Sequence, residues 1–317
     1  MHANGRPLEQ RLSDVDLGYM PLREPNSPVP VYAAAAFFRD AARREGPDIG
    51  CRVVASTSVM ELAMIGKVAL GARTPREAMT RAIGALPFHC THETISIIDL
   101  PNGTILREAW LTPLDHETLH VIQQFVVAIL MTLCRMTGHQ GPIFERVEMM
   151  PHPVHGLDHL RSWSGTQVVA AESEALSITV DPAVFDRRFR VVARDRMTGP
   201  PPPEWAKLRG DGTLSASVRT VMKAMLETGA PTVERLTAVS GMSLRSFQRH
   251  LGHEGTSFSA LLEEVRRELA LQRLGSRKGA LGVLASELGY SGQATLTRAM
   301  RRWTGKTPTG VSAKSAN

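Results

Sequence analysis

The chain has 317 residues, 43% of them hydrophobic, which is enough for two globular domains with buried cores. Its formal net charge of +6 is unevenly placed: residues 204–317 carry 17 Lys and Arg against 9 Asp and Glu, whereas residues 1–203 carry 20 against 22. The basic excess is therefore C-terminal. That is typical of a polyanion-binding module, although a solvated basic surface has the same composition.

The cysteines and apolar runs indicate the compartment. Cys51, Cys90 and Cys134 are scattered and form no CxxC pair, which indicates free thiols in a reducing environment. The N-terminus has no basic-then-apolar signal pattern, and the longest apolar run, residues 125–134, is far shorter than the roughly 20 residues that span a bilayer. We therefore expect a cytoplasmic protein without a membrane partner.

In chain order, residues 1–27 are expected to form a partly ordered arm, because they hold three prolines and little periodicity. Residues 28–197 are expected to form an α+β domain. Its first helices are predicted from Ser or Thr caps, proline in the first turn and apolar stretches, at residues 28–44, 59–70 and 75–86.

Strand chemistry follows these helices. Residues 94–100 and 104–111 are β-branched and apolar around Pro101-Asn102-Gly103, which predicts a hairpin. Residues 115–136 predict one long helix, apolar nearly all round from Phe125, so it is either buried centrally or part of a dimer interface. Further strands are predicted at residues 143–150, 167–171 and 176–180, with a helical segment at 157–163.

A linker is expected at residues 198–212. Its run of four prolines, residues 200–203, favours a stiff polyproline II spacer of about 3 Å per residue. We therefore expect the two domains to be held apart rather than loosely tethered.

Residues 213–317 are predicted to be all-α, with two copies of a helix-turn-helix pattern at residues 232–251 and 280–303. Each copy is a short apolar helix, a turn at a glycine (Gly241 or Gly289), and a second helix with basic and polar side chains. A longer helix, residues 258–274, is predicted between the copies with Ser257 as its cap.

The second helices share an apolar-x-Arg-x-apolar core, residues 247–251 and 296–300, with corresponding positions 49 residues apart. Together with Gly289-Tyr290, Trp303 and Gly305-x-Thr307-Pro308, these residues make the segment 214–310 resemble the DNA-binding domain of the AraC/XylS family of bacterial transcription regulators. Leu296 and Met300 stand where that family usually has Phe, a departure that changes packing rather than chemistry.

The first domain resembles the non-cupin sensor domain of one AraC branch, in the order helix, helix, hairpin, long helix, strand. Members of that branch include regulators of amino-acid and small-acid metabolism. The resemblance implies a domain that binds a small effector and pairs two chains.

Candidate DNA-binding side chains lie on the second helix of each copy. Arg245, Gln248 and Arg249 are spaced to share one face, and the corresponding base-contacting candidates in the second copy are Gln293, Thr297 and Arg298. The alternative is that the arginines bind phosphate or a carboxylate of a neighbouring helix. The candidate phosphate contacts are Ser243, Ser291, Arg301 and Lys306.

Other polar clusters in the sequence do not indicate a metal, cofactor or catalytic site. The stretch His89-Cys90-Thr91-His92 and the group His152, His155 and His159 lack a full tetrahedral ligand set, so we expect no metal and no cofactor. No phosphate loop, GxSxG or HExxH motif is present, so we expect no enzyme. An effector pocket is expected between the hairpin and the long helix. Residues near its polar end would be His116, His120, Gln123 and Gln124, which capping or surface exposure explains equally well, and the effector site stays unassigned.

The sequence thus predicts an AraC-type, sequence-specific transcription regulator, an effector-responsive activator acting as a homodimer. Its expected partners are double-stranded promoter DNA, RNA polymerase and a small-molecule effector. One alternative is a ligand-independent dimeric regulator. The other is an enzyme domain fused to a DNA-binding module.

Overall fold

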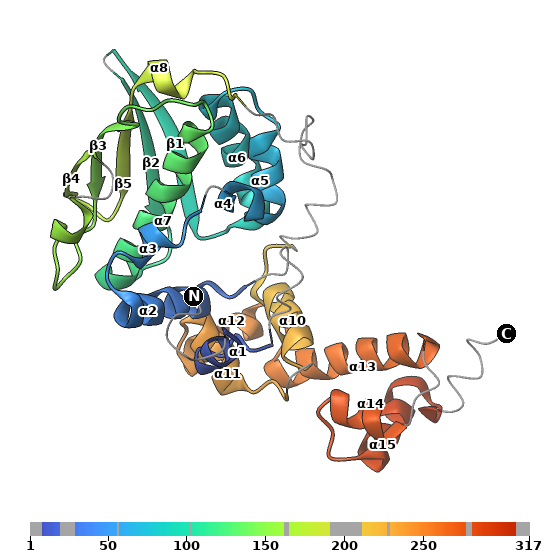
Figure 1. Ribbon diagram of the computed structural model, residues 1–317. Helices are drawn as coiled ribbons and strands as arrows, with labels where there is room; N and C mark the ends of the chain where they lie inside the picture. Colours follow the sequence, from blue (N-terminus) through green and yellow to red (C-terminus); the bar gives the residue numbers. More distant parts are fainter. Residues whose placement is uncertain are drawn as a thin grey trace. The chain divides into compact units, whose positions relative to one another are not determined.

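The computed structural model describes residues 8–19, 29–55, 57–101, 103–161, 165–190, 211–226, 229–276 and 281–308. These residues form two compact units (Figure 1). Each unit has its own core of buried side chains. The first unit is built on residues 34–190, and the second on residues 211–308 together with residues 9–19 and 29–33. The expected proline linker, residues 200–203, lies outside the described residues.

The N-terminal arm contains a helix that the sequence did not predict, α1 (Leu8–Asp14). Residues 9–19 pack within the second unit, where Leu12 and Tyr19 are buried. The Asp16 carboxylate accepts hydrogen bonds of 2.6–3.1 Å from the Arg235 guanidinium. The prediction missed α1 because so short a helix depends on tertiary contacts rather than on a repeating apolar face.

The helices before the sheet are α2 (Val31–Glu45), α3 (Ile49–Arg52), α4 (Ser58–Glu61), α5 (Ala63–Leu70) and α6 (Pro75–His89). The helix predicted over residues 59–70 is interrupted at Leu62, whose ψ of 40° leaves the helical region. Thr74 caps α6 as predicted, because its side chain accepts a hydrogen bond from the Glu77 amide at 3.2 Å. The predicted start of α2, residues 27–28, lies outside the described residues.

A five-stranded sheet follows, in the order β1-β2-β5-β3-β4. Its strands are β1 (Glu93–Leu100), β2 (Gly103–Trp110), β3 (Phe144–Met149), β4 (Gln167–Ala170) and β5 (Leu176–Val180). Neighbours are antiparallel except for the parallel pair β3 and β4. The predicted hairpin is confirmed, with Leu100 paired to Gly103, and so is the mixed α+β class.

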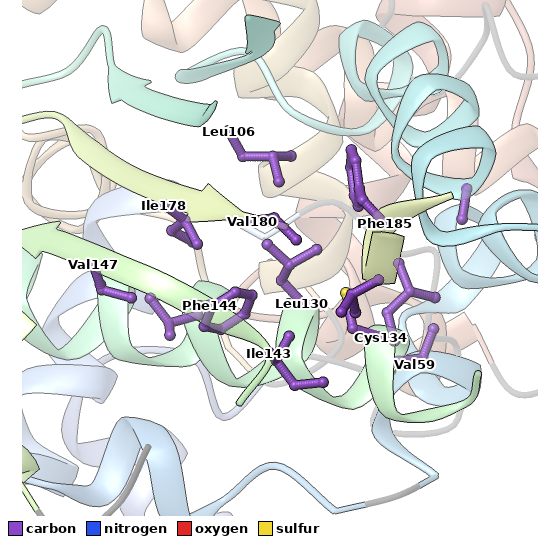
Figure 2. Close-up of a cluster of buried hydrophobic side chains, with 14 of the residues drawn as sticks. Val59, Leu106, Leu130, Cys134, Ile143, Phe144, Val147, Ile178, Val180 and Phe185 are labelled. Atoms are coloured by element: carbon purple, nitrogen blue, oxygen red, sulfur yellow. The ribbon is translucent and has the colours of Figure 1, made fainter. Parts of the chain in front are cut away.

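The long helix α7 (His116–Arg135) is the central helix of this unit. Leu130 and Cys134 lie in one buried cluster with Phe144, Val180 and Phe185, the last from α8 (Pro182–Phe185) (Figure 2). Within the described part of the chain, α7 alone has the length and hydropathy to cross a bilayer, and 67% of its apolar window is buried inside the fold. Burial in a core therefore explains why this helix is apolar nearly all round.

The helical segment predicted at residues 157–163 is only a 3-10 turn, η1 (Asp158–Leu160), and residues 162–164 lie outside the described part. Leu160 is buried, so this segment is held by one apolar side chain rather than by an apolar helix face. A single buried side chain does not require the 3.6-residue period on which the prediction rested.

The second unit is all-helical. Its helices are α10 (Leu214–Met225), α11 (Val233–Ser240), α12 (Leu244–His253), α13 (Phe258–Ser276), α14 (Leu281–Glu287) and α15 (Gln293–Thr304). Ion pairs join α10 to α13, between Arg219 and Glu264 at 2.9 Å and between Lys223 and Glu268 at 2.7 Å. The α14 and α15 helices pack on the C-terminal part of α13 around Ala270, Leu274 and other buried residues.

Candidate nucleic-acid interface and internal cavity

The first helix-turn-helix consists of α11 and α12. Gly241 ends α11 in the left-handed conformation, with φ of 64°, a position where a side chain would be strained. Phe247 and Leu251 are fully buried under α12. Their burial leaves the opposite face of α12 open, and the base-contacting candidates Arg245, Gln248 and Arg249 are all exposed there.

The second helix-turn-helix, α14 and α15, repeats this arrangement. Gly289 has φ of 68°, and Leu296 and Met300 are fully buried at the positions equivalent to Phe247 and Leu251. Gln293 and Arg298 are exposed, whereas Thr297 is half-buried and donates its hydroxyl hydrogen to the Gln293 carbonyl at 2.9 Å. The Thr297 oxygen can therefore accept a hydrogen bond from a ligand, but its proton is already used.

The candidate phosphate contacts, Ser243, Ser291, Arg301 and Lys306, are all exposed. Ser243 also has a structural task that the sequence analysis did not assign: it caps α12 by accepting a hydrogen bond from the Ser246 amide at 3.2 Å. A cap at the start of a helix leaves the neighbouring amides facing outward, which favours an anion at this place.

Arg302, next to the candidate Arg301, is engaged within the protein. Its guanidinium donates to Glu263 at 2.6 and 2.9 Å, and the Trp303 indole N–H donates to the same oxygen at 2.7 Å. These hydrogen bonds hold the pKa of Glu263 below its usual range. The end of α15 is thus fixed to α13 by a carboxylate.

Arg266 of α13 positions the turn of the second helix-turn-helix. It donates to the carbonyl oxygens of Leu288 at 2.8 Å and Gly289 at 3.0 Å, and its guanidinium stacks on the Tyr290 ring at 4.6 Å. Arg266 matches the usual pattern of the AraC/XylS family on this connecting helix, but its partners are backbone atoms 22 and 23 residues away, so local sequence does not predict these contacts.

Replacing Arg266 with alanine is expected to destabilise the second helix-turn-helix by about 1–3 kcal/mol, since it leaves two turn carbonyls without their donor. Hydrogen exchange of the full chain should be faster in α14 and α15 and unchanged in α11. Arg267→Ala removes an exposed arginine from the same helix and is the matched control. Equal exchange in the two variants would contradict the positioning role.

Two polar clusters lie in the first unit. Cys90, His92 and Glu93 have side-chain ligand atoms within 4.8 Å of one another. The His120 and His159 Nε2 atoms are 2.9 Å apart, and their rings lie close to the ring of His152. Burial lowers the pKa of each of these three histidines, to about 4 for His120, so this cluster is neutral in the folded protein.

The polar residues expected at an effector pocket have structural roles instead. His120 bonds the Met150 carbonyl at 2.6 Å, Gln123 donates to the Glu174 carbonyl at 2.8 Å, and Gln124 donates to that of Pro47 at 2.7 Å. Their side chains tie α7 to neighbouring loops and do not line the cavity described below. His116 is exposed near Glu174. Of the two explanations left open for these residues, the structure thus supports a scaffold role for His120, Gln123 and Gln124, because helical spacing alone does not determine which neighbouring segment a polar side chain contacts.

A cavity of about 210 Å³ lies where the sequence placed a pocket, between the hairpin and α7, with α5 and α6 also lining it. Glu93 and Glu108 are the only charged side chains among the described residues that line it. Glu108 is 2% exposed, and neither of its carboxylate oxygens has a hydrogen-bond partner of normal geometry. Burial and the nearby Glu93 carboxylate raise the pKa of Glu108 and a hydrogen bond from Trp110 lowers it, with a net value of about 8.

Comparison with known proteins agrees with this two-unit structure. Residues 5–189 match the protein family described as the arabinose-binding domain of AraC transcription regulators, and residues 236–314 match the family described as a helix-turn-helix domain. The HTH-type transcriptional regulator VirS of Mycobacterium tuberculosis is 38% identical over 101 residues, which are 32% of this chain and 30% of VirS. The ornithine utilization regulator of Pseudomonas aeruginosa is 38% identical over 78 residues, 25% of this chain and 23% of its own.

The chain thus matches less than a third of the length of each of these relatives. Among solved structures, the transcriptional regulator CdpR from Pseudomonas aeruginosa aligns over 97% of both chains, at 16% identity and a TM-score of 0.41. A DNA-binding transcriptional dual regulator from Escherichia coli K-12 aligns over 33% of this chain and 93% of its own, at 28% identity and a TM-score of 0.32. Because the arabinose-binding-domain match alone covers more than half of the chain and a helix-turn-helix match follows it, the chain belongs to the AraC family of transcription regulators.

Proposed function

We propose that this chain binds specific double-stranded DNA sites with α12 and α15. The observation that carries the proposal is the matching pair of exposed arginines, Arg249 and Arg298, on helices whose opposite faces are buried. Arginine can hold guanine O6 and N7, and Gln248 and Gln293 can hold adenine in the same way. Two such helices reach successive major-groove segments about 34 Å apart.

The net charge of +8 between residues 204 and 317 supports binding to the phosphate backbone. Within this proposal Ser243, Ser291, Arg301 and Lys306 contact phosphate, which sets register without reading sequence. The helix α13 contacts both α10, through the ion pair of Glu264, and the turn between α14 and α15, through the hydrogen bonds of Arg266. These contacts favour a fixed separation between α12 and α15.

We further propose that the first unit senses a small molecule and pairs two chains, and that the regulator activates promoters by contacting RNA polymerase in the cytoplasm. In this scheme it needs no cofactor, membrane or catalysis. A ligand shifts the arrangement of such a regulator only if it binds one arrangement more tightly than another.

Arg249→Ala and Arg298→Ala are each expected to cost about 1–3 kcal/mol of binding to a specific site, about 5- to 150-fold in dissociation constant, if the arginine reads a base. Binding to random DNA should change much less. Fluorescence anisotropy at fixed salt, on specific and random duplexes, measures both quantities.

Arg267→Ala removes the same charge from the exposed side of α13 and is the control for a general electrostatic effect. Equal losses on specific and random DNA would assign Arg249 or Arg298 to phosphate. A loss in the control as large as in the two variants would mean that charge alone governs binding.

The proposal as a whole is tested by selection of random DNA on the purified full-length chain, followed by sequencing. We expect a bipartite motif with its halves about one helical turn apart. Enrichment of one half only would mean that the second motif holds phosphate. No enrichment, with binding lost steeply as salt rises, would reject sequence-specific recognition.

A further inference from the structure

The cavity of the first unit is lined mainly by apolar side chains, so most of the surface of a bound molecule would contact apolar groups. Its walls include Ile65 and Ala69 of α5 and Phe125, Ile129 and Leu133 of α7. At about 210 Å³ it is larger than the roughly 150 Å³ apolar cavity that holds one benzene molecule. It therefore has room for an aromatic ring or a short hydrocarbon chain with one small polar group.

Two carboxylates share the face of the hairpin that lines this cavity. Ile95 pairs directly with Glu108, and Glu93 lies two residues before Ile95 on the same strand. Glu93 and Glu108 are thus diagonal neighbours on one face, a separation that long side chains bridge. The backbone register therefore directs two carboxyl groups into one apolar space.

The described residues lining the cavity supply no cation for this pair, although the Cys90 thiol contacts Glu93 and the Trp110 indole lies at Glu108. All of them other than the two glutamates are apolar or glycine, so no ammonium, guanidinium or hydroxyl reaches the carboxylates from α4 to α7 or from β5. A buried polar group without a hydrogen bond costs several kcal/mol, and buried charges in proteins are normally paired. Glu108 breaks this rule, which indicates a partner from outside the chain.

We propose that this cavity is the effector site and that it takes an organic cation, an apolar molecule carrying one protonated amine whose N–H groups bond Glu108 and Glu93. The inference rests on the proposed sensing function of the first unit. An ammonium group supplies the positive charge that the lining of the cavity lacks and the donors that the Glu108 oxygens lack, and the hydrocarbon part fills the space between α5 and α7.

Other effector classes fit this cavity poorly. A sugar would bury several hydroxyl groups, of which two carboxylates can satisfy only some. An organic acid, or the carboxylate of a free amino acid, would bring a negative charge beside Glu93 and Glu108 into a lining that holds no cation to offset it. The cavity therefore selects amines over these classes, whatever sugar the family description names.

Proton exchange accompanies such binding. The raised pKa of Glu108 means that this carboxyl keeps its proton near neutral pH, and an ammonium ligand must displace it. Affinity then rises with pH, approaching tenfold per pH unit up to about pH 8. The titratable groups beside Glu108 are Glu93, His92 and Cys90. The His92 ring packs on the Trp110 ring, with 4.5 Å between the centroids, and the Cys90 sulfur contacts His92. Burial keeps His92 neutral and raises the pKa of Cys90 to about 12, so neither replaces Glu108 in this exchange.

The test is calorimetric titration of the full-length chain with 2-phenylethylamine, hexylamine and cyclohexylamine, against benzyl alcohol and phenylacetate. We expect at least one amine to bind, and to bind at least tenfold more tightly than the alcohol and the acid. Glu108→Gln should weaken that amine at least tenfold and remove most of the pH dependence. The control Glu145→Gln, an exposed carboxylate on β3, should leave affinity unchanged.

Ala82→Leu is the second variant, because Ala82 of α6 lines the cavity and a larger side chain there fills it while Glu93 and Glu108 are retained. It should weaken binding of the amine as well, with both carboxylates still in place. Equal affinity for amine and alcohol, no effect of either cavity variant, or no binding by any of the three amines would overturn the proposal. Binding of zinc alone, abolished by Cys90→Ser, would overturn it in favour of a metal at Cys90, His92 and Glu93.

Amine binding is measured without DNA, so its failure is separate from failure of the DNA-binding proposal. If the chain selects a DNA motif but binds no amine, only the effector class is wrong. If the amine binds and no DNA is selected, the cavity assignment stands and the DNA-binding proposal falls.

Discussion

Glutamine at position 108 is expected to make the first unit markedly more stable than the natural glutamate at pH 8, and to make little difference at pH 5. The folded pKa of Glu108, about 8, lies above the ordinary value of 4.5. The folded chain therefore binds one proton more than the unfolded chain between these values, and stability falls as pH rises through this window. At about 1.4 kcal/mol per pH unit, the loss between pH 5 and pH 8 is about 4 kcal/mol.

Urea denaturation of the full chain at several pH values measures this effect as the difference between Glu108→Gln and the natural protein. The difference should grow steadily from pH 5 to pH 8. Glu145→Gln, on the exposed side of β3, controls for the loss of one negative charge. A constant difference across the pH range would show that Glu108 is ionised in the folded state, with a partner of its own.

Phe247→Ala is the second large effect that we expect. Phe247 is fully buried where α12 meets the rest of its motif, and truncation of a buried phenylalanine costs about 3–5 kcal/mol. The short helices α11 and α12 have few other large buried side chains, among them Leu236 and Leu251, so the first helix-turn-helix should open locally. Specific DNA binding should then fall to what the second motif provides alone.

Hydrogen exchange of the full chain should show faster exchange in α11 and α12, with the first unit unchanged. Leu244→Ala on the same helix removes a leucine that is 45% exposed and should cost almost nothing. If Phe247→Ala exchanged and bound DNA like Leu244→Ala, the burial of Phe247 would not be what holds the recognition helix.

Much of this structure could be predicted because its signals are local. Thr74, Asp115 and Thr232 begin helices as their side chains predict, each accepting a hydrogen bond from an amide three residues later. Gly241 and Gly289 take the left-handed conformation that the turn of each motif requires. Where the local signal is weak, as in α1, the prediction failed because contacts such as the one between Asp16 and Arg235 come from 219 residues away.

The sequence by itself determined the two-unit plan, the hairpin and the two helix-turn-helix motifs, since caps, glycine turns and the period of apolar residues act over a few neighbouring positions. Only the tertiary structure decided that β5 lies between β2 and β3, and that His120, Gln123 and Gln124 serve the scaffold. It also decided that Glu108 faces inward. Successive side chains along β2 point to opposite faces of the sheet, but which face is buried depends on where the helices pack.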